Sequence, residues 1–513
     1  MAVPVWSVDP RTGTRRGQAA EEATAAGVDA AVRAAHATRA ALADRDRRTA
    51  LLRAAAARLT EAGDALIAAA DAETALGVPR LTGELARTTG QFLAFADEVA
   101  DGGALGVVID HADPAATPPR PDLRRYKVPL GVVAVYAASN FPLAFSVPGG
   151  DTASALAAGC PVVVKAHPDH PETSERAAAA LRLAAADAGL PEDVVTLVHG
   201  FQAGIDLIGH PLVTAAGFTG SVRGGRALFD AAAARPVPIP FYGELGSLNP
   251  VVVTERAARE RADEIGAGLA ASMTQGTGQF CTKPGLVLVP SGDAGDALVA
   301  ALAARLGEAA PGVLLDAGMR DAFASGVAAR TALDGVTAPV APGRAADGTV
   351  TPGFLTVDAA GLAAEGPHDL LLDECFGPVT VVVRHTGDAT QGPAAALLAR
   401  LGGSLTATVH LAASETGGEH TATGGALLAA LTPLAGRVLV GGWPTGVAVT
   451  PAQHHGGPYP ATTSLFTSVG ATAIERWLRP VAYQSTPEAL LPPELRDDNP
   501  LGLPRRVDGV RQG

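Results

Sequence analysis

The chain has 513 residues, 47% of them apolar, which is enough for about three domains with large cores. Its formal net charge of −13 disfavours nucleic acid or an anionic membrane as the main partner. The sequence has no run of about 18 uncharged apolar residues, and its N-terminus has no basic segment followed by an apolar stretch. Neither a membrane span nor a secretory signal is therefore predicted.

Three cysteines, Cys160, Cys281 and Cys375, lie far apart and show no CxxC spacing. They are too few and too scattered for a disulfide framework or a zinc site. We therefore expect a protein of the reducing cytoplasm that holds no metal.

Apolar residues at helical spacing predict helices over about the first 100 residues. Residues 104–130 break this pattern with five prolines and paired charges, which is typical of an exposed arm. From Gly131 onward, short apolar runs alternate with helical segments, at 131–138, 161–165, 194–198 and 213–218. This alternation predicts parallel βαβ units and a doubly wound sheet that could bind a dinucleotide.

A second alternating set follows Pro250, with strands predicted at 251–253, 285–289, 380–383 and 437–442. The glycine-rich stretches at 343–353 and 415–425 are interpreted as loops, and the C-terminal tail as an extended surface segment.

Of the three cysteines, Cys281 is the best candidate nucleophile. It lies in a loop of small residues between a predicted helix and a strand, where a thiol can have a depressed pKa. Cys160 enters an apolar strand and is interpreted as a buried hydrophobe. Cys375 follows two carboxylates, which should raise its pKa and keep it protonated.

Other polar residues at predicted strand ends allow both a chemical and a structural interpretation. Glu244 in a glycine-lined turn could be a general base with a raised pKa, or a surface glutamate. Asn140 could hold an oxyanion or cap a helix, and Lys165 could reach a ribose or phosphate or extend into solvent. The turn at Gly220-Ser221 could bind phosphate or simply begin a helix. The pair His454-His455 lacks a third metal ligand and is interpreted as part of a loop.

These motifs occur in an order that resembles the aldehyde dehydrogenase superfamily. They are ASNFPLAF, VVVKAHP, FTGS, GELGSLNP, GQFCT and ECFGPV, and the resemblance runs from about residue 6 to 482. It implies an α/β fold with a doubly wound parallel-sheet cofactor domain, an α/β catalytic domain and a small β oligomerisation arm. We expect the dinucleotide-binding domain at 1–112 and 129–247, the catalytic domain at 248–450, and the arm with the C-terminal tail at 113–128 and 451–513.

The resemblance also implies roles for the catalytic residues. Cys281 would attack the aldehyde carbonyl, and the Asn140 amide and the Cys281 backbone N–H would hold the oxyanion. After hydride transfer to a nicotinamide, Glu244 would activate the water that hydrolyses the resulting thioester. An acyl-transferring relative that passes the thioester to coenzyme A typically lacks this glutamate, and a silent homologue would have lost Cys281 or Glu244.

The resemblance assigns the cofactor contacts to a second group of residues. Glu374 would bind the nicotinamide ribose with Phe376 near the ring, Lys165 the adenosine ribose, and Gly220 with Ser221 the pyrophosphate.

One departure from the family pattern concerns the choice of cofactor. Many members place a glutamate three residues after the strand-ending lysine, where it binds the 2′-hydroxyl of NAD, but this chain has Pro168 there. Without that carboxylate a 2′-phosphate is not repelled, and His167 or Lys165 could attract it. NADP is therefore the expected cofactor, with NAD possible.

Longer blocks, including MTQGTGQFCT and HHGGPYPATTS, resemble the 2,5-dioxovalerate (α-ketoglutaric semialdehyde) dehydrogenase branch. The implied reaction is oxidation of 2,5-dioxopentanoate to 2-oxoglutarate, and a broad aliphatic or fatty aldehyde dehydrogenase is the alternative. Phe145 and Phe280 are predicted near the pocket, but no partner for a substrate carboxylate is identifiable. A homodimer or homotetramer is expected, with a small-molecule aldehyde as substrate and neither nucleic acid nor membrane as partner.

Overall fold

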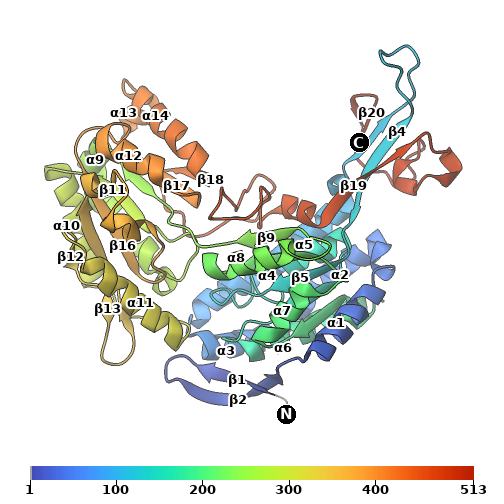
Figure 1. The fold of residues 1–513 in the computed structure, drawn as a ribbon, viewed down its shortest axis with the longest axis horizontal. Coiled ribbons are helices and arrows are strands. Elements are labelled where there is room, and N and C mark those ends of the chain that lie inside the picture. The colour runs from blue at the N-terminus through green and yellow to red at the C-terminus, as the bar shows by residue number, and fades with distance from the viewer. Residues whose placement is uncertain (1–2, 513) are drawn as a thin grey trace.

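The computed structural model describes residues 3–512, which form three main sheets with helices around them (Figure 1). A hairpin of β1 (Pro4–Asp9) and β2 (Thr14–Glu21) precedes the first helix, so the prediction that this segment is helical was wrong. Ser7 is the buried residue of β1, and Gly13 closes the turn with a φ of +71°. The helices that follow are α1 (Ala25–Ala37), α2 (Arg45–Glu61), α3 (Gly63–Thr74) and α4 (Val78–Asp101).

The first large sheet has five parallel strands in the order β7-β6-β5-β8-β9. Its strands are β5 (Val132–Tyr136), β6 (Val162–Lys165), β7 (Val195–Val198), β8 (Val213–Thr219) and β9 (Phe241–Glu244). The helices between them are α5 (Gly150–Ala158), α6 (Pro171–Asp187), α7 (Phe201–Gly209) and α8 (Val222–Ala233). The order reverses direction at β5, as a doubly wound sheet requires, and this confirms the predicted fold class.

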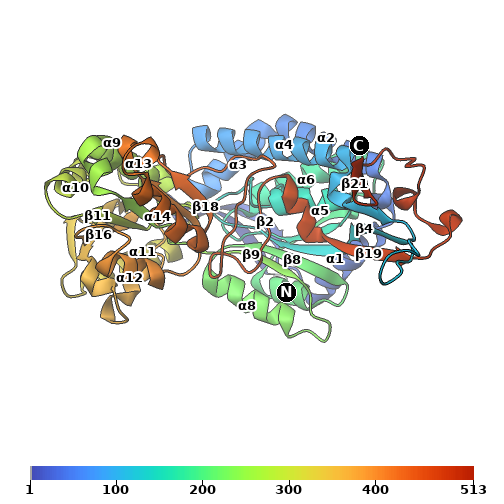
Figure 2. The same cartoon turned by 90° about the horizontal axis from the view of Figure 1, so that it is seen from above.

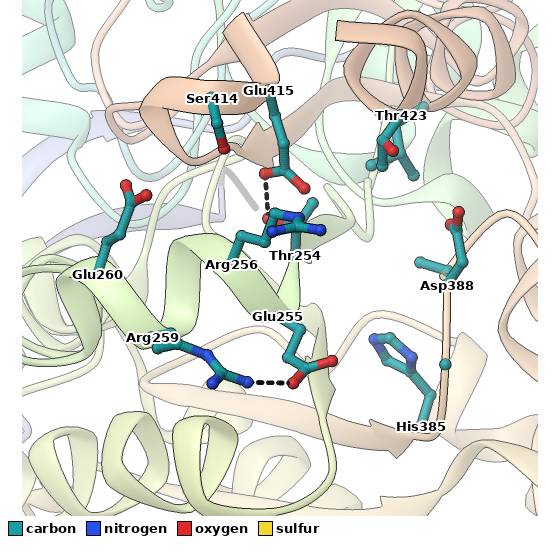
Figure 3. A pocket seen from close by; sticks show the side chains of 13 residues that line it. Thr254, Glu255, Arg256, Arg259, Glu260, His385, Asp388, Ser414, Glu415 and Thr423 are labelled. Carbon is teal, nitrogen blue, oxygen red and sulfur yellow. Dashed lines mark hydrogen bonds and ion pairs between the residues drawn. The ribbon is translucent and has the colours of Figure 1, made fainter. Parts of the chain in front are cut away.

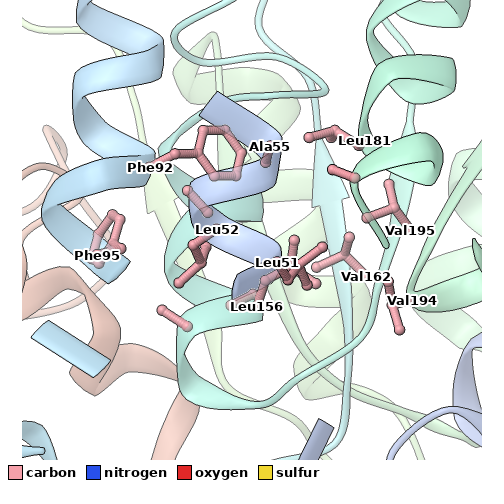
Figure 4. Packing of buried hydrophobic residues seen from close by; sticks show 14 of the residues in the cluster. Leu51, Leu52, Ala55, Phe92, Phe95, Leu156, Val162, Leu181, Val194 and Val195 are labelled. Atoms are coloured by element: carbon pink, nitrogen blue, oxygen red, sulfur yellow. The ribbon is translucent and has the colours of Figure 1, made fainter. Parts of the chain in front are cut away.

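One core joins the N-terminal helices to this sheet (Figure 4). Leu51 and Leu52 of α2 pack with Phe92 of α4, with α6, and with Val162 of β6, and all four named side chains are at most 1% exposed. Each such side chain contributes about 1.5–3 kcal/mol by leaving water. The helices are thereby fixed against the face of the sheet.

The second large sheet has seven strands in the order β12-β15-β16-β11-β10-β17-β18 and is parallel except at β12. Its strands are β10 (Val251–Val253), β11 (Leu286–Pro290), β12 (Thr337–Val340), β15 (Gly353–Asp358), β16 (Val379–His385), β17 (Ser404–His410) and β18 (Ala435–Val440). Helices α9 (Glu255–Thr274), α10 (Asp293–Gly307), α11 (Ala317–Thr331), α12 (Gly392–Arg400), α13 (Ala413–Gly417) and α14 (Thr421–Leu431) surround it.

Two glycine-rich stretches predicted as loops contain regular structure. The first holds a short hairpin of β13 (Gly343–Arg344) and β14 (Val350–Thr351). In the second, α14 begins at Thr421, and its Leu427 and Leu431 are fully buried. Tertiary packing of these leucines outweighs the low helix propensity of the neighbouring glycines.

The arm is a third sheet, in the order β19-β4-β3-β20-β21. Its strands are β3 (Val107–Asp110), β4 (Leu123–Pro129), β19 (Leu478–Gln484), β20 (Arg505–Val507) and β21 (Val510–Gln512). The segment 107–110, expected in the dinucleotide-binding domain, pairs with β4 here because its buried Val107 and Ile109 pack on Leu495 and Leu503.

Both views place the arm at the end of the molecule opposite the seven-stranded sheet (Figures 1 and 2). Within residues 3–512, no helix combines the length and the apolar character needed to cross a membrane.

Candidate active site

The candidate catalytic residues meet where the two parallel sheets face each other. Glu244 ends β9, and Asn140 follows β5, so both lie at the carboxyl edge of the five-stranded sheet. Cys281 lies in the loop between α9 and β11, at the amino edge of the seven-stranded sheet. The site is therefore assembled from opposite edges of two sheets.

The loop that carries Cys281 has an unusual backbone. Gly276, Thr277 and Gly278 all have positive φ, at 54°, 59° and 68°. A Cβ at Gly278 would meet the backbone of Gly377, so glycine is required by both conformation and space. The side-chain amide of Asn249 donates to the carbonyl oxygen of Cys281 at 2.8 Å. These features fix the thiol in one position.

Cys281, His455 and Glu244 form a connected group. The Cys281 Sγ lies 3.7 Å from His455 Nε2, which lies 2.9 Å from Glu244 Oε1. The second carboxylate oxygen of Glu244 accepts a hydrogen bond from the Ser468 hydroxyl. His455 lies in a loop, as interpreted from the sequence, but that loop is buried at the site. Ser468, in the segment expected to form part of the arm and tail, also reaches Glu244. The segment that follows β18 returns across the site before it enters the arm.

The pKa values of Glu244 and Cys281 are shifted in the directions opposite to those expected from the sequence. Burial would raise the pKa of Glu244, but the charge and hydrogen bond of His455 hold that pKa below its ordinary value of 4.5. Burial and the neighbouring Glu244 carboxylate raise the pKa of Cys281 well above 9.0. The resting pair is thus a carboxylate beside a neutral thiol, and the thiol needs a base before it can attack. The pKa of Cys375 is also raised, as expected, although burial is the main cause.

Asn140 is held between two elements. Its side-chain amide donates to the carbonyl oxygen of Gln279 at 3.0 Å, two residues before Cys281. Its backbone carbonyl accepts from Arg80 Nη2 at 2.5 Å. The buried Glu84 carboxylate accepts from the backbone N–H groups of Leu143 and Ala144 at 2.8 and 2.9 Å. Helix α4 therefore positions the loop that carries the asparagine.

A cavity of about 160 Å³ opens on the thiol. As expected from the sequence, Phe145 and Phe280 line it. Arg80 and Arg87 of α4 also line it, and the sequence analysis missed both. The Arg80 guanidinium lies 4.7 Å from the centroid of the Phe280 ring, and the Arg87 guanidinium lies 5.0 Å from that of Phe145.

Both arginines hold buried nitrogen atoms without a hydrogen-bond partner among residues 3–512: Nε and Nη1 of Arg80, and Nη1 of Arg87. Residues 80 and 87 are two helical turns apart, so their side chains project from one face of α4. This spacing was present in the sequence, but nothing local indicated that the face meets Cys281.

The predicted contacts of the adenosine half of a cofactor lie on the five-stranded sheet. Lys165 ends β6, and Ser221 caps α8 with its hydroxyl accepting from the Gly224 N–H at 3.2 Å. Gly220 and Ser221 are exposed at the N-terminus of this helix, where backbone N–H groups favour an anion. His167 Nδ1 lies 3.3 Å from Asp169 Oδ2, and burial lowers the pKa of His167 well below 6.5. Lys165 is therefore the cation available at this strand end.

Glu374 and Phe376 lie in the loop before β16, at the same amino edge as Cys281. The Glu374 carboxylate rests against Gly246, where a Cβ would collide with it. Burial raises the pKa of Glu374 to about 7, although Lys283 opposes this. Phe376 is half-buried beside it.

A separate cavity of about 560 Å³ lies at the carboxyl edge of the seven-stranded sheet (Figure 3). His385 at the end of β16, together with Thr254, Arg256 and Glu415, lines it. None of the predicted site residues lines this cavity. Of these two cavities, a choice by volume would favour the edge of this sheet opposite to the one that holds Cys281.

Comparisons with known proteins identify the family of this chain. The profile of the family described as "Aldehyde dehydrogenase family" matches residues 4–392. Alpha-ketoglutaric semialdehyde dehydrogenase 2 of Azospirillum brasilense is 48% identical over 468 residues, which is 90% of this chain and 87% of that protein. Alpha-ketoglutaric semialdehyde dehydrogenase of Acinetobacter baylyi is 42% identical over 469 residues, covering 89% of this chain and 85% of the relative.

Solved structures share the fold. PnpE in complex with nicotinamide adenine dinucleotide superposes with a TM-score of 0.78 at 24% identity, covering 95% of each chain. A 3,6-anhydro-L-galactose dehydrogenase superposes with a TM-score of 0.77 at 21% identity, covering 94% of this chain and 96% of the other.

Proposed function

Because the chain belongs to the aldehyde dehydrogenase family, whose members oxidise aldehydes with NAD(P), we propose that it oxidises 2,5-dioxopentanoate to 2-oxoglutarate. Two relatives that match about 90% of the chain are named for this semialdehyde. The substrate carries a carboxylate at one end and the reactive aldehyde at the other, so its site must offer a cation at some distance from the nucleophile.

The single observation that carries this proposal is the pair of arginines in the cavity of Cys281. Arg87 has an unpartnered buried Nη1 and, among residues 3–512, no salt bridge within 4.0 Å. An Arg–carboxylate pair is planar and can be bidentate, so it fixes both the position and the orientation of a substrate. Arg80 supplies a second guanidinium but also holds the backbone of Asn140. We therefore assign the substrate carboxylate first to Arg87.

The chemistry we propose begins with the Cys281 thiol. One base beside the sulfur accepts its proton as Sγ attacks the aldehyde carbon: either ionised Glu244 or His455 in its neutral form. A side-chain N–H of Asn140 and the backbone N–H of Cys281 stabilise the oxyanion, and one such donor is typically worth about 2.7–4 kcal/mol of barrier. When bound, the nicotinamide cofactor accepts the hydride that leaves this adduct.

The second half of the reaction is hydrolysis of the Cys281 thioester. Glu244 is suited to activate water because its lowered pKa keeps it ionised at neutral pH. Its hydrogen bonds to His455 and Ser468 fix the carboxylate in one orientation. The products are the carboxylic acid and the free thiol.

The chain's residues fit a nicotinamide dinucleotide. The exposed Gly220-Ser221 turn at the start of α8 suits a pyrophosphate, Lys165 a ribose or 2′-phosphate, and Glu374 with Phe376 the nicotinamide ribose and ring. We propose NADP as the preferred cofactor because Pro168 replaces the glutamate that would repel a 2′-phosphate. NAD is the second candidate.

A broad aliphatic aldehyde dehydrogenase is the alternative, and one observation favours it. Three phenylalanines, Phe141, Phe145 and Phe280, line the same cavity and would accept an alkyl chain. Steady-state kinetics on 2,5-dioxopentanoate and on pentanal, each with NADP and NAD, separate the two. We expect 2,5-dioxopentanoate with NADP to give the highest kcat/KM. A tenfold or greater advantage for pentanal, about 1.4 kcal/mol, would overturn the semialdehyde assignment.

We further propose that the chain works as a homodimer or homotetramer in the cytoplasm. Strands β18 and β19 are edge strands of their sheets in the chain, and such edges are commonly paired or covered. The three cysteines are unpaired, as a reducing compartment would leave them. Light scattering after size-exclusion chromatography tests the assembly, and a monomer at micromolar concentration would contradict it.

A further inference from the structure

The three side chains at the centre of the site have the composition of a transition-metal site. The ligand atoms of Glu244, Cys281 and His455 all lie within 4.8 Å of one another. A thiolate, an imidazole and a carboxylate are the donors that Zn²⁺ takes in proteins, commonly three from the chain with a fourth position open. The pair His454-His455 lacks a third ligand in the sequence, but the fold supplies Glu244 and Cys281 from two other segments.

The spacing of the donor atoms suits tetrahedral coordination. Around Zn²⁺, a sulfur and a nitrogen lie about 3.6 Å apart, and a nitrogen and an oxygen about 3.4 Å. The corresponding distances here are 3.7 Å from Cys281 Sγ to His455 Nε2 and 2.9 Å from that nitrogen to Glu244 Oε1. The sulfur–nitrogen distance thus matches, and the nitrogen–oxygen distance must lengthen by about 0.5 Å when the ion binds. The cavity, which Cys281 and His455 both line, leaves the fourth position open to water.

We propose that Cys281, His455 and Glu244 form a reversible inhibitory site for Zn²⁺ and other thiophilic divalent cations. Binding breaks the S–H bond of Cys281 and forms a metal–sulfur bond, and the proton passes to the buffer without oxidation or reduction. The ion occupies the sulfur that the aldehyde must reach. Metal and aldehyde therefore exclude each other, and a chelator restores activity.

Direct metal binding tests the site independently of any reaction. Competition between the full-length protein and a chromophoric chelator should give one Zn²⁺ per chain, and Co²⁺ should give a thiolate charge-transfer band with tetrahedral d–d bands. We expect His455→Asn and Cys281→Ser to weaken Zn²⁺ binding by roughly 100-fold each, since each removes one of three ligands. His454→Asn, at the neighbouring half-buried histidine, and Cys375→Ser, at another half-buried thiol, are the matched controls and should bind as the parent does.

Inhibition kinetics then connect binding to activity. With pentanal or 2,5-dioxopentanoate, Zn²⁺ should raise the KM for the aldehyde, Mg²⁺ at the same concentration should not, and EDTA should reverse the effect. The consequence for rate rests on the proposed role of Cys281, whereas the binding experiment does not, so the two can fail separately. Equal Zn²⁺ affinity in the parent and His455→Asn would show a thiol acting alone and would overturn the site. Absence of stoichiometric binding by the folded parent would overturn it as well.

Discussion

The two parallel sheets of this enzyme contribute to the site from opposite edges. The five-stranded sheet presents its carboxyl edge, with Lys165, Asn140 and Glu244 at or just after strand ends. The seven-stranded sheet presents its amino edge, with Cys281 and Glu374 just before strands. The carboxyl edge of the second sheet, where a doubly wound fold usually binds its ligand, instead holds the cavity of Figure 3, which none of the candidate site residues lines.

The two edges differ in which ends of the neighbouring helices lie at them. Helices begin at a carboxyl edge, and their positive N-terminal ends favour phosphate, as at Gly220-Ser221 before α8. At an amino edge helices end, and α9 ends at Thr274, before Cys281, so this helix does not offer the thiol the N-terminal end that stabilises a thiolate. We propose that the base for Cys281 comes from outside its own sheet. The candidates are Glu244, at the end of β9, and His455, on the segment after β18.

The largest expected effect comes from removing the nucleophile at the amino edge. Cys281→Ala should lower kcat by about a thousandfold or more, because no other group at the site can form the thioester. The substitution should leave the proposed cofactor contacts at the carboxyl edge unchanged. The affinity for NADP, measured by calorimetry, should therefore stay within about twofold of that of the parent. The alanine variant of Cys375 is the matched control and should keep its rate. Residual activity of Cys281→Ala above a tenth of the parent would remove Cys281 from the mechanism.

The next largest effect should come from the base at the opposite edge. Glu244→Gln keeps the shape of the side chain but removes the carboxylate, so deacylation should slow by about 10²- to 10⁴-fold. Stopped-flow mixing should then show one equivalent of reduced cofactor in a burst, followed by little turnover. If the burst itself disappears, Glu244 is needed to activate the thiol and His455 cannot replace it.

Much of the fold could be predicted because its signals are local. Short runs of valine such as 162–164 and 251–253 between helical segments are typical of buried parallel strands, and they became β6 and β10. The hairpin at residues 4–21 was missed because its first strand has a single buried residue and its second strand is mostly exposed. Helix α14 was missed because glycines suggested a loop, while packing of two leucines determined the result.

The candidate site likewise contains some residues with a local sequence signal and others without one. Cys281 and Glu244 could be named because each stands in a motif of its own. His455 is 174 residues from Cys281 and 211 from Glu244 in sequence, and only the fold brings them together. Arg80 and Arg87 had no local signal, since two arginines on a helix are ordinary on a solvated surface. The pKa directions of Cys281 and Glu244 also depended on neighbours that local sequence cannot supply.

A third variant tests whether α4, which packs beside both edges, supplies substrate recognition. Arg87→Met keeps the packing on Phe145 but removes the charge, so kcat/KM for 2,5-dioxopentanoate should fall about 10- to 100-fold. Pentanal, which has no carboxylate, should be oxidised at an unchanged or improved rate. An equal loss on both substrates would mean that Arg87 supports the shape of the site and does not bind the carboxylate.

The smallest expected effect concerns the cofactor end of the carboxyl edge. Burial raises the pKa of Asp169 to about 7, with the nearby Asp316 and Glu73 adding to the shift and Lys165 opposing it. Below pH 7 the carboxyl is protonated and neutral, and above pH 7 its charge faces the position we assign to a 2′-phosphate beside Lys165. The KM for NADP should therefore rise roughly fivefold between pH 6 and pH 8, while the KM for NAD should change little. Asp169→Asn should remove that rise and favour NADP at pH 8. The same carboxyl contributes to the free energy of unfolding. This contribution is complete below the carboxyl's unfolded pKa of about 4 and is lost as the pH rises through 7. Asp169→Asn should therefore also remove this part of the pH dependence of unfolding. A KM for NADP with the same pH profile in parent and variant would place the 2′-phosphate away from Asp169.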